Sequence, residues 1–186
     1  MYVGCGIHPD CTYEESHVEY TYPGVFIVQS AGNHNSFSTC TGSNPRHYMP
    51  AASGAADAYD GIMVVGAVDN TGATVDSDFS ATVPPGLTAT TPASNYGNCV
   101  DIWAPGDAIY AVWGNLSGDT VLGTTYSSVA SISGTSMSAP HVAAAAAYYA
   151  DVYSLTSPSA IEQAIRGAWA TLGSDRNSAT VHFVQF

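Results

Sequence analysis

The sequence contains no lysine, and its only basic residues are Arg46, Arg166 and Arg176. With 15 acidic residues in a chain of 186, the formal net charge at pH 7 is −12. Nucleic acids and anionic membranes are bound by basic surfaces, so this composition argues against both kinds of partner. The acidic surplus is compatible with calcium binding or with cationic substrates, although solubility alone is the more ordinary explanation.

The sequence also lacks an apolar run of the roughly 20 residues that a membrane-spanning helix needs. The longest apolar segment, residues 142–150, is too short. No basic segment followed by an apolar stretch comes after Met1, so we expect any export signal to lie upstream. Charged residues make up only 10% and hydrophobic residues 46%. This balance excludes ordinary disorder and indicates a globular domain with a real core.

The four cysteines, Cys5, Cys11, Cys40 and Cys99, form no paired C-x-x-C metal motif. An even number of scattered cysteines favours two disulfides and an extracellular or secreted protein, with free thiols in a cytosolic enzyme as the alternative. Four cysteines allow three pairings. A bond between Cys40 and Cys99 with one between Cys5 and Cys11 is one of these, and the sequence does not decide among them.

Several apolar segments rich in β-branched residues lie between turn residues and are expected to be buried strands. They are residues 25–30, 62–67, 100–103 and 108–112, with residues 180–186 as a closing strand. Because their apolar residues are continuous rather than alternating, we expect a mainly parallel sheet that is covered on both faces.

Two clear helices are expected in the C-terminal half. The first starts at Ser136 or Met137 and runs through the alanine-rich segment 142–150, which is small and apolar all round and should therefore be buried. The second starts with Ser157 as N-cap and runs to about Ala168. Strands alternating with helices indicate an α/β fold.

The segment with the clearest chemical meaning is residues 133–142, SGTSMSAPHV. A glycine-containing turn delivers Ser136 to the start of the long helix, where backbone N–H groups are unpaired and carry partial positive charge. A serine in this position can attack a carbonyl while its own N–H helps to hold the oxyanion. An ordinary serine or threonine N-cap is the alternative interpretation.

Residues 134–141, GTSMSAPH, closely resemble the nucleophile signature of the subtilase family of serine peptidases. Residues 62–67 and 95–106 are similar to two further family segments, the Val-Gly-Ala strand and the strand with its Ala-Pro-Gly turn in proteinase K-like members. The resemblance implies a three-layer α/β fold with a mainly parallel central sheet, Ser136 as nucleophile, polypeptide substrates and no cofactor for catalysis. It covers most of residues 25–170, and the loops at 34–60, 69–94 and 113–130 look longer than in compact members.

By the same resemblance, two other segments contribute to the site. Ala31-Gly32-Asn33 directly follows a predicted strand and is similar to the family's Ala-Ala-Gly-Asn segment, which implies that the Asn33 amide donates to the oxyanion. Ala31 and Gly32 are expected to face the specificity pocket. Val3 and Gly4 stand where the family has a pocket-lining strand, and we expect them to pair with the substrate backbone.

Asp101 lies in a predicted strand and aligns with an aspartate that binds calcium in proteinase K-like members. Oxygen ligands suit this hard cation, so a structural calcium at Asp101 is one expectation. A capped or salt-bridged aspartate is the more ordinary interpretation of a single carboxylate.

The sequence lacks the family's His-Gly-Thr motif and its Asp-Thr-Gly or Asp-Ser-Gly motif. In subtilisin the chain order is Asp, then His, then Ser, so both partners are expected before Asn33. His141 follows Ser136 by five residues in a helix and points away from it, so we assign it to packing. We therefore expect residues 1–186 to be the C-terminal part of a single subtilase catalytic domain whose N-terminal portion is missing, inactive alone and monomeric when complete.

A non-catalytic subtilase-like module, serving in binding or structure, is the alternative from another functional class. A sedolisin-type serine peptidase is a weaker one, because that family has an aspartate where Asn33 stands and its serine motif does not continue as Met-Ser-Ala-Pro-His.

Overall fold

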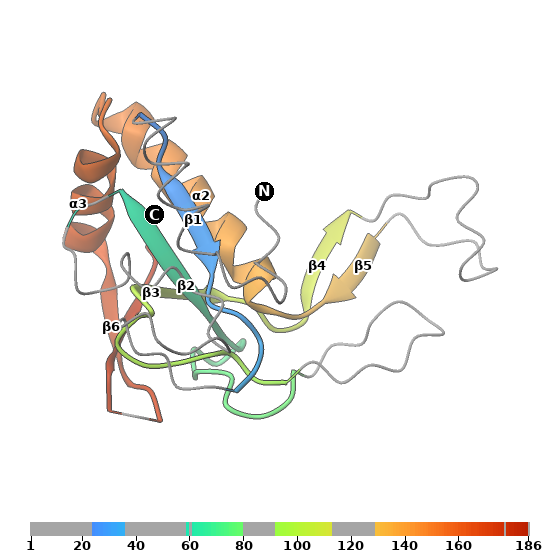
Figure 1. Ribbon diagram of the computed structural model, residues 1–186. Helices are drawn as coiled ribbons and strands as arrows, with labels where there is room; N and C mark the ends of the chain where they lie inside the picture. Colours follow the sequence, from blue (N-terminus) through green and yellow to red (C-terminus); the bar gives the residue numbers. More distant parts are fainter. Residues whose placement is uncertain are drawn as a thin grey trace, which may run out of the picture.

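The computed structural model describes residues 24–35, 59, 61–79, 92–112, 129–176 and 178–185. These residues form a five-stranded sheet of order β1-β2-β3-β7-β6, a separate two-stranded sheet of β4 and β5, and helices α2 and α3 (Figure 1). The strands are β1 Ile27–Ser30, β2 Ile62–Val68, β3 Ile102–Pro105, β4 Ile109–Val112, β5 Val129–Ile132, β6 Ala170–Ser174 and β7 Thr180–Phe183. The helices are α2 Thr135–Val152 and α3 Pro158–Ala168. Neither of these two described helices is long and apolar enough to cross a bilayer.

The larger sheet is mainly parallel. Strands β1, β2, β3 and β7 pair in parallel, and β6 joins the edge antiparallel to β7. All seven residues of β2 are buried, as the continuous apolar run predicted. The expectation of an α/β fold with a mainly parallel sheet is confirmed. A parallel sheet also places the ends of β1, β2 and β3 at one edge, where the chain turns toward the site described below.

The expected strand 108–112 exists, but its place in the sheet was predicted wrongly. It is β4, and it pairs antiparallel with β5 outside the larger sheet. Tyr110 is 78% exposed, so this hairpin projects away from the core (Figure 1). Hydrophobicity identifies a strand without identifying its partner, and β5 itself begins within a segment that was expected to be a loop.

Helices α2 and α3 cover one face of the larger sheet. The core there combines residues of β2 and β3 with residues of both helices, namely Met63, Val65, Ile102, Ala104, Val142, Ala145, Ala146, Tyr149 and Ile165, together with Val184. The opposite face packs Val64, Val68 and Trp103 against Cys99 and Val100 of the loop before β3. Alternate residues of β2 thus enter two separate apolar clusters, which stabilise the sheet from both sides.

The expectation that α2 is buried on all sides is wrong. Its buried side includes Val142, Ala145 and Tyr149, whereas Ala143 and Tyr148 are exposed. An apolar sequence does not separate the two sides, because a surface alanine and a core alanine are chemically identical. Only packing against the sheet distinguishes them.

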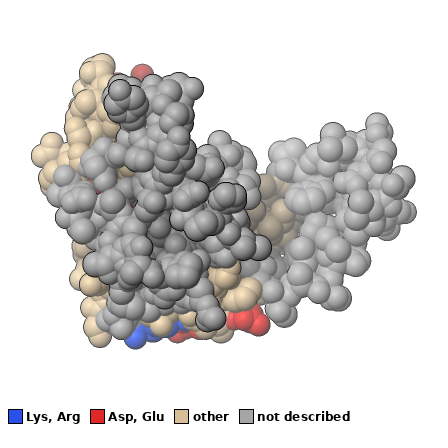
Figure 2. Space-filling model, in the orientation of Figure 1, with Lys and Arg blue, Asp and Glu red and all other residues tan. Residues whose placement is uncertain are grey.

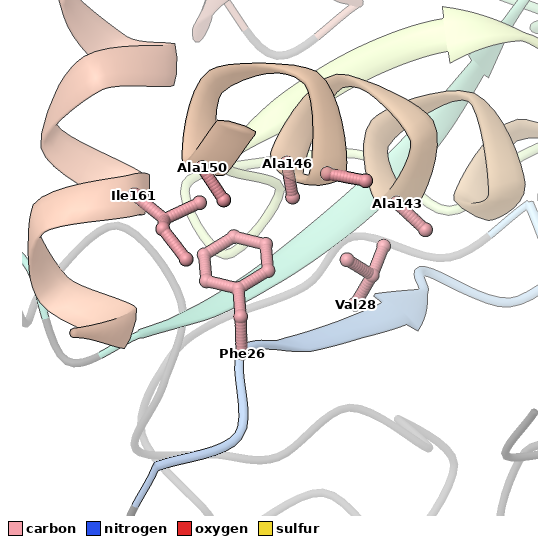
Figure 3. A pocket seen from close by; sticks show the side chains of 7 residues that line it. Phe26, Val28, Ala143, Ala146, Ala150 and Ile161 are labelled. Atoms are coloured by element: carbon pink, nitrogen blue, oxygen red, sulfur yellow. The ribbon is translucent and has the colours of Figure 1, made fainter. Parts of the chain in front are cut away.

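An apolar pocket of about 240 Å³ lies between β1, α2 and α3 (Figure 3). Its lining consists of Phe26, Val28, Ala143, Ala146, Ala147, Ala150 and Ile161. These side chains carry no polar group that could bind or activate a peptide. The pocket also involves the beginning of β1 and the later turns of α2, whereas Asn33 follows β1 and Ser136 lies in the first turn of α2.

Arg176 connects several loops that are distant in sequence. Its guanidinium donates to the side chain of Asn35 and to the carbonyl oxygens of Asp76 and Ser94, and it lies 4.0 Å from the ring centroid of Tyr96. On the face seen in Figure 2, the basic atoms of the described residues gather at one edge beside acidic atoms. One of the few arginines is therefore used to join loops that are distant in sequence.

Candidate active site

The turn that carries Ser136 leaves the N-terminus of α2 without a local cap. Gly134 is the N-cap residue, with φ of 148°, and offers no side chain to cap the helix. Ser136 is the second residue of α2 and is exposed, whereas Thr135 before it is fully buried. Since the first N–H groups of a helix have no intrahelical acceptor, the Ser136 N–H can serve as a donor beside its own hydroxyl. The predicted start at Ser136 or Met137 differs from the observed start at Thr135 by one or two residues.

Asn33 reaches this helix end from the turn after β1. Its Oδ1 accepts two hydrogen bonds from Thr135, one from the backbone N–H and one from the hydroxyl, both at 2.9 Å. These two bonds identify the Nδ2 side of the amide as the donor side. Nδ2 lies 3.1 Å from the place that a Cβ on Gly134 would occupy. The two residues singled out from the sequence, Asn33 and Ser136, are thus brought together through Thr135.

The Ala-Pro-Gly turn supports the nucleophile turn. The N–H of Gly134 donates to the carbonyl of Gly106 at 2.8 Å. A Cβ on Gly106 would lie 2.2 Å from Ser138 Oγ and 2.6 Å from the Cβ of Ala67. Only glycine fits this contact without displacement. The start of α2 therefore packs directly on the backbone of the Ala-Pro-Gly motif at the end of β3.

Ser133 and Asp107 fix the strand that leads into the nucleophile turn. The Ser133 hydroxyl donates to Asp107 Oδ1 at 2.7 Å and accepts from the Ala108 N–H at 2.8 Å. These bonds join the two chain segments on either side of the site, after β3 and before α2.

Two buried side chains that hold the Asn33 turn received no role from the sequence. The Thr135 hydroxyl accepts from the N–H of Gly32 at 3.0 Å in addition to donating to Asn33. Asn95 bonds the same turn through both ends of its side chain. The signals were present, since both residues lie inside the matched motifs. A polar residue in a turn motif does not, however, indicate which distant segment it binds.

Of the four residues predicted to contact substrate, the structure describes Ala31 and Gly32. Val3 and Gly4 lie outside the described residues. The side chain of Ala31 is fully buried in the core, and its N–H continues the pairing of β1 with β2 by donating to Val65. Its contact with the specificity pocket stays a prediction. Gly32 is partly exposed in the turn itself, with φ of 92°. It remains a candidate for backbone contact with a substrate.

Asp101 does not fit a calcium ion, and the expectation of a metal there is not supported. Its side chain is completely buried, with Oδ1 2.8 Å from Arg166 Nη2 and Oδ2 accepting from the Val64 N–H at 2.8 Å. Burial raises the pKa of Asp101 to about 7, against the opposing effects of Val64 and Arg166. Arg166 also bonds Glu162, whose carboxylate is equally buried. Oδ1 of Asp101 therefore attaches α3 through Arg166, and Oδ2 holds the backbone of β2.

No cluster of three or more His, Cys, Asp or Glu side chains suited to a metal ion is found in the described ranges. Cys99 is 1% exposed and carries no free thiol. Cys5, Cys11 and Cys40 lie outside the described residues, so the pairing of the cysteines stays a prediction.

Two of the histidines in the described ranges are engaged in contacts of their own. His141 Nδ1 lies 2.9 Å from the Met137 carbonyl within α2, in agreement with a packing role. The His182 ring stacks on Trp169 with centroids 3.7 Å apart, and burial, followed by the charge of Arg166, lowers its pKa. His34 is exposed next to Asn33, and its backbone N–H donates to Asn95. His8, His17 and His47 lie outside the described residues.

Known proteins resemble this chain in sequence. The "Extracellular serine proteinase" of Thermus sp. (strain Rt41A) is 34% identical over 142 residues, which is 76% of this chain and 25% of that protein. The "Subtilisin-like protease 2" of Pseudogymnoascus destructans is 34% identical over 143 residues, 76% of this chain and 26% of that protein. The chain thus spans about a quarter of the length of these curated relatives.

Among solved structures, a protease from Pseudoalteromonas arctica PAMC 21717 matches with a TM-score of 0.63 at 21% identity, covering 98% of this chain and 46% of that one. This likeness concerns the fold. The model of the subtilase family, Peptidase_S8, matches residues 11–183. That match, together with relatives 34% identical over 76% of the chain, shows that this chain belongs to the subtilase family.

Proposed function

We propose that this chain forms the nucleophile-bearing part of a serine endopeptidase, with Ser136 as nucleophile and Asn33 with the Ser136 N–H as oxyanion donors. The observation that carries the proposal is the pair of hydrogen bonds from Thr135 to Asn33 Oδ1. They orient the amide so that its Nδ2 donor lies on the other side, beside the N-terminus of α2, which also carries Ser136. Donors placed where negative charge develops are usually the largest contribution to catalysis of acyl transfer.

The proposed reaction follows from this arrangement. Ser136 Oγ attacks the carbonyl carbon of the substrate peptide bond, and a histidine takes the hydroxyl proton. The carbonyl oxygen becomes an oxyanion that accepts from Asn33 Nδ2 and the Ser136 N–H. When the carbon–nitrogen bond breaks, the histidine returns the proton to the leaving amine, and water then hydrolyses the acyl-enzyme in the same way.

The histidine and the aspartate that orients it are proposed to be supplied by a segment upstream of this chain. His141 and His182 make other contacts, and the family order of Asp, His and Ser places both partners before Asn33. Without the histidine, turnover in the subtilisin series falls by about 2 × 10⁶, so we expect the 186-residue chain alone to be inactive.

The test is covalent labelling of the complete open reading frame that contains this chain with a fluorophosphonate probe. We expect the label on Ser136, located by mass spectrometry, and its loss in Ser136→Ala. Ser159→Ala is the matched control, because Ser159 is likewise the second residue of a helix, α3, and its loss should leave labelling unchanged. Labelling at another residue, or none at all, would end this proposal.

A non-catalytic subtilase-like module is the second candidate, favoured by the absence of both the His-Gly-Thr and the Asp-Thr-Gly or Asp-Ser-Gly motifs from the sequence. It predicts that the reading frame upstream also lacks them. Sequencing that region discriminates the two candidates, because the peptidase requires both motifs there.

An extracellular, monomeric enzyme acting on polypeptides is part of the proposal. One relative is named an extracellular serine proteinase, and the cysteine content fits an oxidising compartment. The catalytic steps are proposed to need no cofactor.

We also propose a disulfide between Cys99 and Cys40. Peptide mapping without reduction tests this disulfide.

A further inference from the structure

Asn95 is a fully buried polar side chain in the loop before β3, and the proposed reaction does not use it directly. We propose that Asn95 is a positioning residue that sets the direction of the Asn33 amide. This inference rests on the proposed function, because it concerns the same oxyanion donor.

The two ends of the Asn95 carboxamide bond both sides of the Asn33 turn. Asn95 Nδ2 donates to the carbonyl of Ala31 at 2.8 Å, and Asn95 Oδ1 accepts from the N–H of His34 at 3.1 Å. The backbone N–H of Asn95 donates to the carbonyl of Gly32 at 2.8 Å. One residue thus spans the turn from the position two before Asn33 to the position just after it.

The turn that carries Asn33 is held from one side by Asn95 and from the other by Thr135. Gly32 has φ of 92°, a conformation that favours glycine, and a Cβ there would lie 2.8 Å from Asn95 Nδ2. On the other side, the Thr135 hydroxyl accepts from the Gly32 N–H and donates to Asn33. Thr135 therefore holds the tip of the Asn33 side chain, while Asn95 holds the backbone from which that side chain projects.

The chemistry of the contact selects asparagine. One end of the side chain must donate to a carbonyl and the other must accept from an N–H, at a fixed separation. The substitution Asn95→Asp keeps nearly the same shape, but an ionised carboxylate has no donor. Its second oxygen would face the Ala31 carbonyl and repel it, which releases one side of the turn.

The experiment compares Asn95→Asp with Asn98→Asp in the complete reading frame. Asn98 is exposed in the same loop, so it is a matched control for the change in charge. We expect N95D to lower kcat by about 10-fold to 100-fold, less than the loss of about 10² to 10³ on removing an oxyanion donor, with KM changed less than about twofold. N98D is expected to leave both constants near their wild-type values.

The pH dependence tests whether the missing donor causes the loss of kcat, provided that circular dichroism shows N95D to be folded to the same extent at each pH. A protonated carboxyl can donate to the Ala31 carbonyl again, so the ratio of N95D to wild-type kcat is expected to rise as the pH is lowered. The ratio cancels the titration of those groups whose pKa is the same in both proteins. A ratio that stays flat with pH contradicts the proposal.

A double-mutant cycle tests whether Asn95 acts through Asn33. In an Asn33→Ala background the donor is absent, so N95D is expected to lower kcat by no further factor beyond about two. A full second decrease would overturn the inference. If N95D does not fold, judged by circular dichroism, Asn95→Ser keeps the backbone bond to Gly32 and takes its place, and failure of both variants to fold overturns a positioning role.

The outcomes also distinguish this inference from the proposed function. A wild-type protein that the fluorophosphonate probe does not label ends both. A wild-type protein that is labelled and active, with N95D equal to N98D in kcat, ends only the inference about Asn95.

Discussion

The two helices begin in opposite ways. Helix α3 is closed by its own sequence, since the Ser157 hydroxyl accepts from the N–H of Ala160 and Pro158 follows the cap. Helix α2 begins after Gly134 with no side-chain cap of its own, and its first N–H is satisfied by Asn33 from the turn after β1. The missing local cap of α2 is therefore not a defect of this helix. It leaves donors and a hydroxyl facing outward at the place where the proposed site needs them.

The attachment of the two helices to the sheet differs as well. Helix α2 lies on the sheet through apolar residues, whereas α3 adds to its apolar contacts the ion pairs of Arg166 with Glu162 and Asp101. The ionic network therefore belongs to α3, while the helix that presents Ser136 carries almost no charge. Three substitutions, at Arg166, Asn33 and Ser157, test how the two helices are held and how each begins.

Arg166→Met is expected to have the largest effect, lowering the free energy of unfolding by about 3–5 kcal/mol, because it leaves two buried carboxylates without their cation. Burial already raises the pKa of Asp101 to about 7, above its ordinary value, so the folded state binds a proton that the unfolded state has lost. The contribution of Asp101 to stability therefore falls as the pH rises from about 4 through 7, and removal of Arg166 extends this fall to higher pH.

Urea unfolding of the wild type and R166M at pH 5 and pH 8 measures this effect. We expect the difference in free energy between the two proteins to be larger at pH 8. Arg166→Lys is the control, since it keeps the charge and is expected to retain part of the stability. A difference that is equal at both pH values would contradict this prediction, because it would mean that removing Arg166 does not change proton binding by Asp101 over this range.

Asn33→Ala is expected to lower kcat by about 10² to 10³, which corresponds to about 2.7–4 kcal/mol in the transition state. This magnitude is the one known for the equivalent donor of subtilisin, a member of the same family. KM is expected to change little, because the oxyanion forms only after substrate binding. Steady-state kinetics of the complete reading frame provide the measurement, with the exposed Asn98→Ala as control. An unchanged kcat would remove Asn33 from the oxyanion hole.

Ser157→Ala is expected to have the smallest effect, a loss of about 1 kcal/mol in the free energy of unfolding through the missing N-cap of α3. Activity at a temperature where the protein is folded is expected to stay unchanged. Thermal unfolding and kinetics together check this, and a fall in kcat would mean that the start of α3 is coupled to the site.

Much of this architecture was predictable from local sequence. β1 and β2 were placed within two residues of their observed bounds because their apolar runs end at turn residues. The start of α3 was placed correctly because Ser157 and Pro158 are strong local signals. β6 was missed, since four of its five residues are exposed and it has no core pattern. Its existence depends on pairing with β7.

The candidate site was predictable only in part. The motif around Ser136 and the residue Asn33 could be recognised, since both belong to local patterns. Asp101 was given a metal role that its surroundings do not support, because the arginine that pairs with it lies 65 positions later in the chain. Asn95 and Thr135 were missed for the same reason, since their partners are set by the folded topology and not by the neighbouring residues.

The scarcity of basic residues gives the position of Arg176 a practical consequence. Trypsin cleaves after lysine or arginine, and this lysine-free sequence offers it three such positions, at 46, 166 and 176. At position 176 the guanidinium is bound to Asn35, to the carbonyl of Ser94 and to the ring of Tyr96. Trypsin can act there only after these loops have separated. The rate of cutting after Arg176 therefore reports how often these loops separate.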